Sequence, residues 1–342
     1  MLETTWFVLW GLLWAVYFVL DGFDFGMGTL LPFLAKNDEE KRIIYNAAGP
    51  YWDGNEVWLI TAGGVTFAAF PKAYAVMFSA LYAPLLILLF ALIFRAVSFE
   101  FRNKKDCPQW RKFWDACQFL GNFLPALLLG VAFANLFMGI PIDGNGVYHG
   151  NIIKLLNPYG LAGGIFFVLI FAMHGALWLA LKSEGDIHER AVGAAQGVWP
   201  LVLAVALLFL ALTAFYTNLY ANYAEHPTLL VFPILAVASL LTVRVMIWAD
   251  NLLGAWFFSA LFIITVTFFG VLGMYPGIII SSIDPAYSVT VFNGASSPLT
   301  LKIMLGVTLC CIPVVIAYQA WVYYTFAHKV TPESLQKDDH AY

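Results

Sequence analysis

The stretch DGFDFGMG, residues 21–28, places two aspartates inside a long apolar segment. Residues 6–20 form an apolar run of fifteen residues, and the apolar character resumes after the stretch up to Phe33. On membrane-insertion scales, an acidic residue at the centre of a membrane helix costs about 2.5–3.5 kcal/mol. Asp21 and Asp24 therefore need a buried partner, or a function that explains their position.

The composition of the whole chain is that of a multi-pass membrane protein. Of its 342 residues, 61% are hydrophobic and 11% are charged, whereas a soluble domain has about 25% charged residues. A net charge of −4 without a basic block makes nucleic acid a poor candidate for a partner. The four cysteines form no C-x-x-C pair, so we expect packing thiols.

Nine segments are long and apolar enough to cross a bilayer, whose hydrocarbon core of about 30 Å needs about 20 such residues per helix. They are residues 5–34, 48–70, 74–101, 111–139, 159–182, 189–216, 227–249, 251–275 and 299–327. The expected fold is therefore an all-α polytopic membrane protein. An odd count with mostly short connections favours two antiparallel four-helix bundles plus one C-terminal helix. We expect the first bundle in residues 1–139 and the second in 140–275. Residues 276–342 would then hold an outer loop, the ninth helix and a short cytoplasmic tail.

The distribution of lysine and arginine predicts the orientation, because cytoplasmic loops carry an excess of both. With the N-terminus outside and the C-terminus in the cytoplasm, the inner side holds Lys36, Lys41, Arg42, Arg102, Lys104, Lys105, Arg111, Lys112, Lys182, Arg190, Lys329 and Lys337. The outer side then holds Lys72, Lys154 and Lys302. The opposite orientation would reverse this excess, so we expect the N-terminus outside.

Four carboxylates fall at matched depths if the first two segments form a hairpin that turns around residues 38–39. Asp21 and Glu56 are then equidistant from the turn, and so are Asp24 and Asp53. Each pair on one segment is spaced i, i+3, which places both members on one helix face. We therefore expect the four carboxylates to lie close together in the cytoplasmic half of the membrane.

The first segment also carries a polar stripe and a small-residue edge. Tyr17 precedes Asp21 by four residues and continues the stripe through Asp24. Gly22 and Gly26 form a G-x-x-x-G edge, which lets a neighbouring helix approach closely.

Two interpretations of the carboxylates remain open. Crowded carboxylates withdrawn from water can hold a proton near neutral pH, which favours a proton-handling cluster open to the cytoplasm. Alternatively, the cluster is neutralised by Arg95 or by water and serves assembly alone.

The sequence lacks the residues expected of a redox centre. Haem ligation usually needs axial His, Met or Cys, and of the six histidines only His174 lies well inside an apolar segment. A hydrogen-bonded contact between helices explains that histidine better than a ligand role. No P-loop and no H-E-x-x-H sequence occurs either.

Several stretches occur in an order that resembles a known family. They are LDGFDFGMG (20–28), AAGPYWDGNEVWLITAGG (47–64), FRAVSFEFR (94–102), GNFLPALLLGVAFAN (121–135) and MYPGIIIS (274–281). Over roughly residues 6 to 325, the chain resembles subunit II of the cytochrome bd-type quinol oxidases of prokaryotic membranes.

This resemblance implies an obligate heterodimer in the prokaryotic plasma (inner) membrane. Subunit I of that family binds two b haems and haem d, oxidises quinol at the outer face and reduces oxygen to water. Subunit II packs against it by a pseudo-twofold and is expected to ligate no haem or other metal. A small single-helix accessory subunit, a bound structural quinone and membrane lipid are further expected partners. The chain alone is not expected to be catalytic.

The resemblance also implies roles for individual residues. Asp21, Asp24 and Asp53 match the positions that line a hydrophilic proton route along the subunit interface, and Glu56 stands where some members carry Gln. We expect Tyr17, Asn55, Arg95 and Glu100 to support the route by hydrogen bonds or charge pairing. Trp58 either borders an apolar oxygen path or is an ordinary inner-leaflet tryptophan.

Two other functions remain as alternatives. A purely structural partner subunit would carry the same carboxylates without moving protons. A proton-coupled secondary transporter would be expected to have inverted repeats around a site at the membrane midplane. Here the charges lie off-centre and no repeat is evident, so the oxidase subunit is the preferred interpretation.

Overall fold

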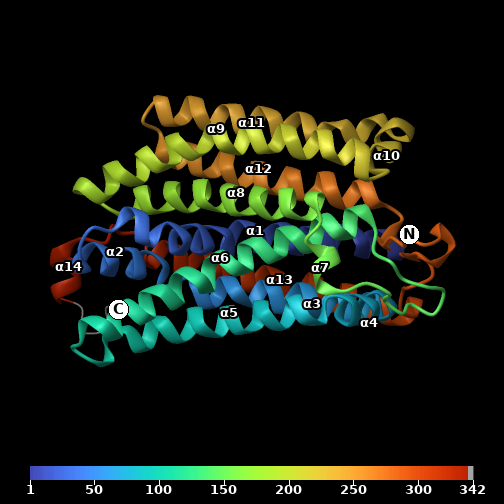
Figure 1. Cartoon of the computed structure of the whole chain (residues 1–342), viewed down its shortest axis with the longest axis horizontal. Helices are drawn as coiled ribbons and strands as arrows, with labels where there is room; N and C mark the ends of the chain where they lie inside the picture. Colours follow the sequence, from blue (N-terminus) through green and yellow to red (C-terminus); the bar gives the residue numbers. More distant parts are fainter. Residues whose placement is uncertain (338–341) are drawn as a thin grey trace.

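The computed structural model describes residues 1–337 and Tyr342, except for the side chains of Gln336 and Lys337; residues 338–341 lie outside this description. Long helices lie side by side along one axis, and the two ends of the chain lie at opposite ends of the bundle (Figure 1). The helices are α1 (Leu2–Leu34), α2 (Asp38–Ala48), α3 (Trp52–Ala69), α4 (Pro71–Ala80), α5 (Tyr82–Phe101), α6 (Pro108–Met138), α7 (Ile152–Leu155), α8 (Pro158–Lys182), α9 (Gly185–Tyr216), α10 (Leu219–Glu225), α11 (Val231–Trp248), α12 (Leu252–Met274), α13 (Pro298–Thr325) and α14 (Pro332–Lys337). Short 3₁₀ turns are η1 (Arg102–Lys104), η2 (Pro227–Leu230) and η3 (Pro285–Tyr287), and strands β1 (Gly277–Ile279) and β2 (Val289–Thr290) pair antiparallel.

Within the described residues, eight helices are long and apolar enough to cross a membrane: α1, α5, α6, α8, α9, α11 with η2, α12 and α13. They confirm the multi-pass membrane class. The expected segment 48–70 appears as α3, which has only 18 residues and carries Asp53 and Glu56. The expected single segment 74–101 is wrong, because it divides into α4 and α5 at Leu81. Pro84 explains this break: it has no N–H to donate to the carbonyl of Ala80, four positions earlier, and its ring crowds that carbonyl.

Proline and side-chain caps define where several helices begin. Proline occupies the first turn of α4, α6, α8 and α13, where its missing N–H costs no hydrogen bond. The side chain of Asn157 accepts a hydrogen bond from the N–H of Gly160 at the start of α8, at 2.8 Å. Asn37 caps α2 in the same way through the N–H of Glu40. These signals separate the membrane helices from the connections at each end.

Helix α1 lies at the centre of the bundle and packs against α3, α6, α8 and α12. Helices α9 and α11 lie on one side of this centre, whereas α3, α5 and α13 lie on the other (Figure 1). In the most apolar stretch of α13 only 6% of the residues are buried, against 72% for α8. Helix α13 therefore lies at the periphery of the chain, and α8 belongs to its core.

The G-x-x-x-G edge of α1 forms a close crossing with α8, as the sequence predicts. A Cβ atom added at Gly26 would lie 1.8 Å from the carbonyl oxygen of Phe171, and one added at Gly175 would lie 2.5 Å from the nitrogen of Met27. The two backbones therefore approach so closely that only glycine fits at the contact. This crossing holds the Asp21–Asp24 face of α1 at a fixed rotation.

Replacing Gly26 with Ala is expected to lower the stability of the protein by about 1–3 kcal/mol, because the added methyl overlaps backbone atoms that cannot rotate away. Gly197→Ala on α9 is the matched control, since nothing lies within 4 Å of the Cβ position there. The control should leave stability unchanged or raise it slightly, because alanine favours helix more than glycine does. Thermal unfolding of the purified complex measures both. Equal melting temperatures for the two variants would contradict this account of the crossing.

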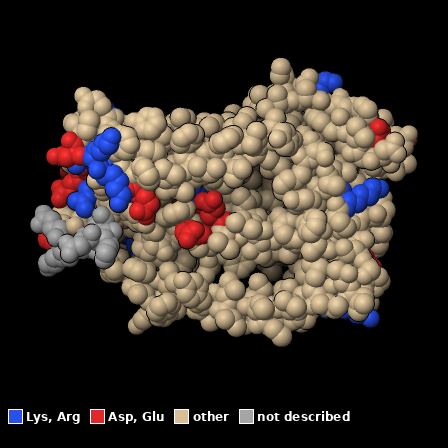
Figure 2. Space-filling model, turned by 90° about the horizontal axis from the view of Figure 1, so that it is seen from below, with Lys and Arg blue, Asp and Glu red and all other residues tan. Residues whose placement is uncertain are grey.

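Charged side chains gather at the end of the bundle where α2, η1 and α14 lie, the α2 end (Figure 2). There Arg102 binds Asp115 and Asp38 at 2.7 and 2.6 Å, and Lys41 also binds Asp115, at 2.8 Å. Partial burial alone would raise the pKa of Asp38, but the hydrogen bond and charge of Arg102, assisted by Arg111, lower it below the usual range. Asp38 therefore stays ionised near neutral pH, and the ion pairs tie α2 to the start of α6.

Candidate functional site

Arg95 on α5 joins the first two helices of the carboxylate cluster. Its guanidinium binds both carboxylate oxygens of Asp21, at 2.7 and 3.1 Å, and also binds Glu56 of α3 at 2.7 Å. Arg95 and Asp21 are fully buried, whereas the Glu56 side chain is 24% exposed. Asp21 and Glu56, which the sequence places at equal distances from the turn, thus bind the same cation. Two carboxylates around one cation leave this clasp with a net negative charge if both are ionised.

Asp24 lies one turn further along α1 and has a different environment. One carboxylate oxygen accepts a hydrogen bond from the amide of Asn55 at 2.7 Å, and the other has no hydrogen-bond partner among the described residues. Asn55 in turn accepts a hydrogen bond from the hydroxyl of Tyr323 on α13 at 3.0 Å. Asp24 is buried, and none of the ion pairs within the described residues includes it. It therefore differs from Asp21, whose charge a cation compensates.

Further buried polar atoms around the cluster also have no partner within the described chain. They include the hydroxyl of Tyr17 and the Nε atom of Arg95. A buried polar group without a hydrogen bond is costly, and ordered water usually satisfies such groups in proteins. The site thus has free hydrogen-bonding capacity on both sides of Asp21.

Asp24 and Asp53, which the sequence places at equal distances from the turn, do not contact each other among the described residues. Asp53 lies in the first turn of α3, is exposed, and forms no hydrogen bond or ion pair within the described residues. The physical reason is the separate helix α2, which ends before Pro50 so that α3 starts anew at Trp52. Glu100 is likewise exposed, near the end of α5.

Trp58 lines an apolar groove between α1, α3, α12 and α13 that has a volume of about 510 Å³. Its ring N–H donates a hydrogen bond to Gln319 of α13 at 3.1 Å, and Gln319 donates to the carbonyl of Gly54 at 3.0 Å. One end of the groove is therefore polar, and it adjoins the Tyr323–Asn55 hydrogen bond.

Sequence reasoning missed the contribution of α13. Gln319 and Tyr323 are four residues apart and so share a helix face, a spacing that could have singled them out. Phe326, which follows the last residue of α13, accepts a hydrogen bond through its carbonyl from buried Lys182 of α8. Lys182 also donates to the hydroxyl of Tyr51 at 2.7 Å. These contacts hold the α2 end of α13 against α3 and α8.

His174 does not fit the role of a haem ligand. It is fully buried, its Nδ1 lies 2.5 Å from the hydroxyl of Ser259, and its Nε2 lies 3.1 Å from the carbonyl oxygen of Val19. Both ring nitrogens are thus engaged in linking α1, α8 and α12, and neither is free to bind iron. Among the described residues, no group of three His, Cys, Asp or Glu side chains could hold a metal ion.

The fold and the site together define a class: a multi-pass helical membrane protein with a buried Asp–Arg–Glu clasp and a separate buried aspartate. The family model for cytochrome bd terminal oxidase subunit II matches residues 2–326. The chain belongs to this family, and it is therefore a subunit of a respiratory quinol oxidase.

Curated relatives and a solved structure agree with this assignment. The chain is 37% identical over 336 residues to cytochrome bd ubiquinol oxidase subunit 2 of Bacillus subtilis, with 96% of this chain and 97% of the relative covered. It is 34% identical to cytochrome bd-I ubiquinol oxidase subunit 2 of Escherichia coli K12, with 99% and 98% covered. A chain in the structure of bd oxidase from Geobacillus thermodenitrificans shares the fold with a TM-score of 0.80 at 15% identity, with 95% and 98% covered.

Proposed function

We propose that this chain is the haem-free subunit of a quinol:oxygen oxidoreductase, and that it stabilises a haem-binding partner and carries part of the proton-uptake route. The observation that carries the proposal is the buried Asp24, one oxygen of which has no partner among the described residues, next to Asp21, which Arg95 binds. Quinol, named in the relatives as ubiquinol, would be oxidised by the complex and not by this chain.

The geometry supports a division of labour between the two buried aspartates. Asp21 shares its negative charge with Arg95 and serves as a fixed structural anion. Asp24 has no such cation among the described residues. It can therefore take up and release a proton without breaking an ion pair, whereas protonation of Asp21 would disrupt its contacts with Arg95. Glu56, one quarter exposed, and exposed Asp53 would connect the cluster to water at the α2 end. Water bound to the unpartnered oxygen of Asp24 would complete the relay.

The face formed by α3, α5 and α13 is the best candidate for the partner interface. Exposed charges such as Asp53 and Glu100 lie on it, and a charge facing lipid is costly. The same face presents Gly63 and Gly64 on α3 and Gly306 on α13, with nothing within 4 Å of their Cβ positions. Small residues let a partner helix approach closely. A haem-bearing subunit I would cover this face, and the two b haems and haem d would reside there.

We further propose nine crossings, with α3 as the ninth. Its 18 residues span about 27 Å, and the chain ends lie at opposite ends of the bundle, which requires an odd number of crossings. The excess of Lys and Arg at the α2 end supports a cytoplasmic C-terminus in a prokaryotic plasma membrane. Residues 1–139 and 140–275 would then form two four-helix bundles, with α13 as the terminal helix.

The groove beside Trp58 suits one of two apolar occupants. A structural quinone could place its ring at the polar end near Gln319 and Tyr323 and its tail along α1 and α13. Oxygen could instead use the apolar part as a path that Trp58 borders. A small single-helix accessory subunit would bind to a part of the lipid-facing surface that subunit I does not cover.

Purification of the native complex tests the proposed function. We expect this chain to copurify with a haem-bearing subunit and the optical spectrum to contain b-haem bands and a chlorin band at the red end. The isolated chain, expressed without its partner, is the control and should carry no haem absorption. A complex without chlorin absorption and without a haem-bearing partner would refute the proposal.

A further inference from the structure

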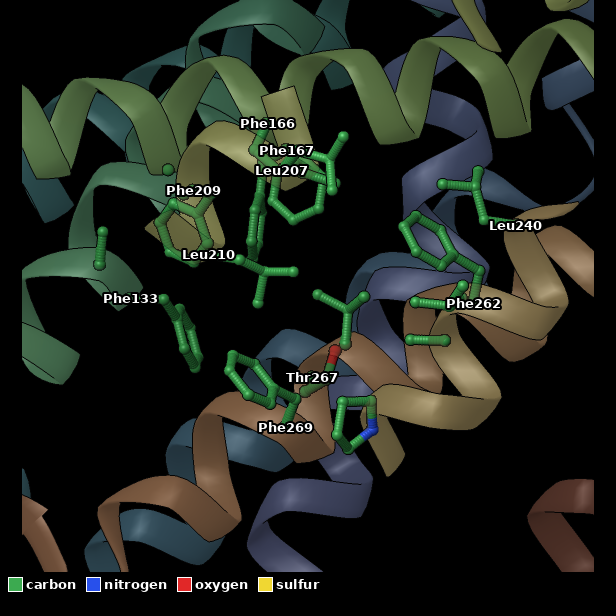
Figure 3. Close-up of a pocket in the computed structure, with 18 of the residues that line it drawn as sticks. Phe133, Phe166, Phe167, Leu207, Phe209, Leu210, Leu240, Phe262, Thr267 and Phe269 are labelled. Atoms are coloured by element: carbon green, nitrogen blue, oxygen red, sulfur yellow. The ribbon is translucent and has the colours of Figure 1, made fainter. Parts of the chain in front are cut away.

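A second cavity lies outside the carboxylate cluster, toward the end of the bundle remote from the α2 end. It has a volume of about 120 Å³ and lies where α6, α8, α9, α11 and α12 meet. Figure 3 shows the rings of Phe133, Phe166, Phe209, Phe262 and Phe269 arranged around it. Most of its other lining is aliphatic, so the cavity is apolar nearly throughout.

The cavity offers nothing that would hold water. Thr267 is the hydroxyl-bearing side chain among the lining residues, and its Oγ already donates to the carbonyl of Ile263 at 2.8 Å. A buried water needs two to four polar partners, whereas an apolar cavity of about 150 Å³ stays dry and takes up benzene or xenon. An occupant of this cavity must therefore be apolar.

The cavity opens sideways toward the lipid-facing surface. Helix α9 packs mainly on α8, and α11 packs mainly on α12, so the cavity lies at the seam between two helix pairs. The residues at the seam are exposed: Leu207 by 60%, Val237 by 54% and Leu241 by 48%. Toward the α2 end the seam is closed, because the ring N–H of Trp199 donates to the carbonyl of Leu240 at 2.7 Å. The space is thus open to the bilayer and not to water.

The depth of the cavity matches the inner part of one leaflet, toward the bilayer midplane. Tyr216 ends α9 and Tyr220 follows on α10, and tyrosines concentrate at membrane interfaces. Leu210 and Leu207 precede Tyr216 by six and nine residues, which places them about 9–14 Å below that interface. The hydrocarbon chains of one leaflet extend about 15 Å, half of the bilayer core.

We propose that this cavity binds the acyl chain of a membrane lipid, which inserts between α9 and α11 and completes the packing of the α8–α12 half of the protein. The structure offers apolar contacts to the chain and no charged group to a head group at this site, so selection acts on the hydrocarbon. The inference is independent of the proposed proton route, because the cavity shares no residue with the carboxylate cluster.

The test uses the intact complex in lipid nanodiscs made from phospholipid brominated in the methyl-terminal half of its acyl chains. We expect a bromine scattering peak inside the cavity of the unaltered protein. Ala236→Phe, which fills the cavity from α11, should abolish that peak while oxygen consumption is retained. Ala238→Phe is the control on the same helix: Ala238 is exposed and does not line the cavity, so the peak should remain. Ala206→Leu on α9 replaces the first variant if that protein does not assemble.

Lipid removal gives a second measurement. Stripping lipid with detergent should lower the melting temperature of the unaltered complex more than that of the Ala236→Phe complex, whose cavity no longer needs a ligand. Three results would overturn the proposal: no bromine in the cavity, a peak that persists in the filled variant, or density that continues into a quinone ring.

Discussion

Replacing Arg95 with Gln is expected to cost the assembled complex about 3–5 kcal/mol, because it leaves Asp21 buried without its cation. Glu56 would lose the same partner, but it reaches solvent and can rehydrate. The loss of haem-loaded complex from the membrane fraction and the fall in melting temperature measure this effect.

Two further variants separate charge from shape at this position. Arg95→Lys keeps the charge but cannot bind both oxygens of Asp21. The melting temperature of this complex should therefore lie between those of the unaltered and the Arg95→Gln complexes. The double variant Asp21→Asn with Arg95→Gln should recover much of the lost stability. Removing both charged partners costs less free energy than leaving one of them buried without the other. If Arg95→Gln assembles and melts like the unaltered complex, the clasp does not stabilise the protein.

Replacing Asp24 with Asn is expected to slow oxygen consumption by roughly 10²-fold or more, the range typical of losing a positioned proton-transfer group. The replacement has nearly the same shape, and its amide oxygen can still accept the hydrogen bond from Asn55. Assembly and haem content should therefore be preserved, and only the ability of this side chain to take up and release a proton is lost. Steady-state oxygen consumption at matched haem content measures the effect.

Asp53→Asn provides the comparison for this variant. We expect it to slow turnover too, but less, because Asp53 lies outside the buried hydrogen-bond network that holds Asp24. Equal turnover of the Asp24→Asn and unaltered complexes would leave the carboxylates with a structural role alone.

Much of the fold could be predicted from the sequence, because an apolar run of 20 residues has few alternatives to a membrane helix. The exceptions are local. Helix α2 is polar and short, so hydropathy does not detect it, and it separates α1 from α3. Pro84 divides an otherwise continuous apolar segment, and the length criterion does not respond to a single break.

The site could be predicted only in part. Counting residues from the turn correctly places Asp21 opposite Glu56, and Arg95 is the cation proposed to neutralise them. Asn55, expected to support the route, is the hydrogen-bond partner of Asp24, but its own link to Tyr323 could not be found in this way, because Tyr323 lies 268 residues further along the chain. A contact between helices so distant in sequence depends on how the bundle packs, and no local pattern encodes it.

The most direct test of the proton-route proposal follows proton uptake itself. The complex is reconstituted in liposomes with a pH indicator on the side of the α2 end, and an oxygen pulse is given to the fully reduced enzyme. We predict that Asp24→Asn delays proton uptake from that side by the same factor as turnover, while electron transfer between the haems keeps its rate. Proton uptake with unaltered kinetics in this variant would contradict the account.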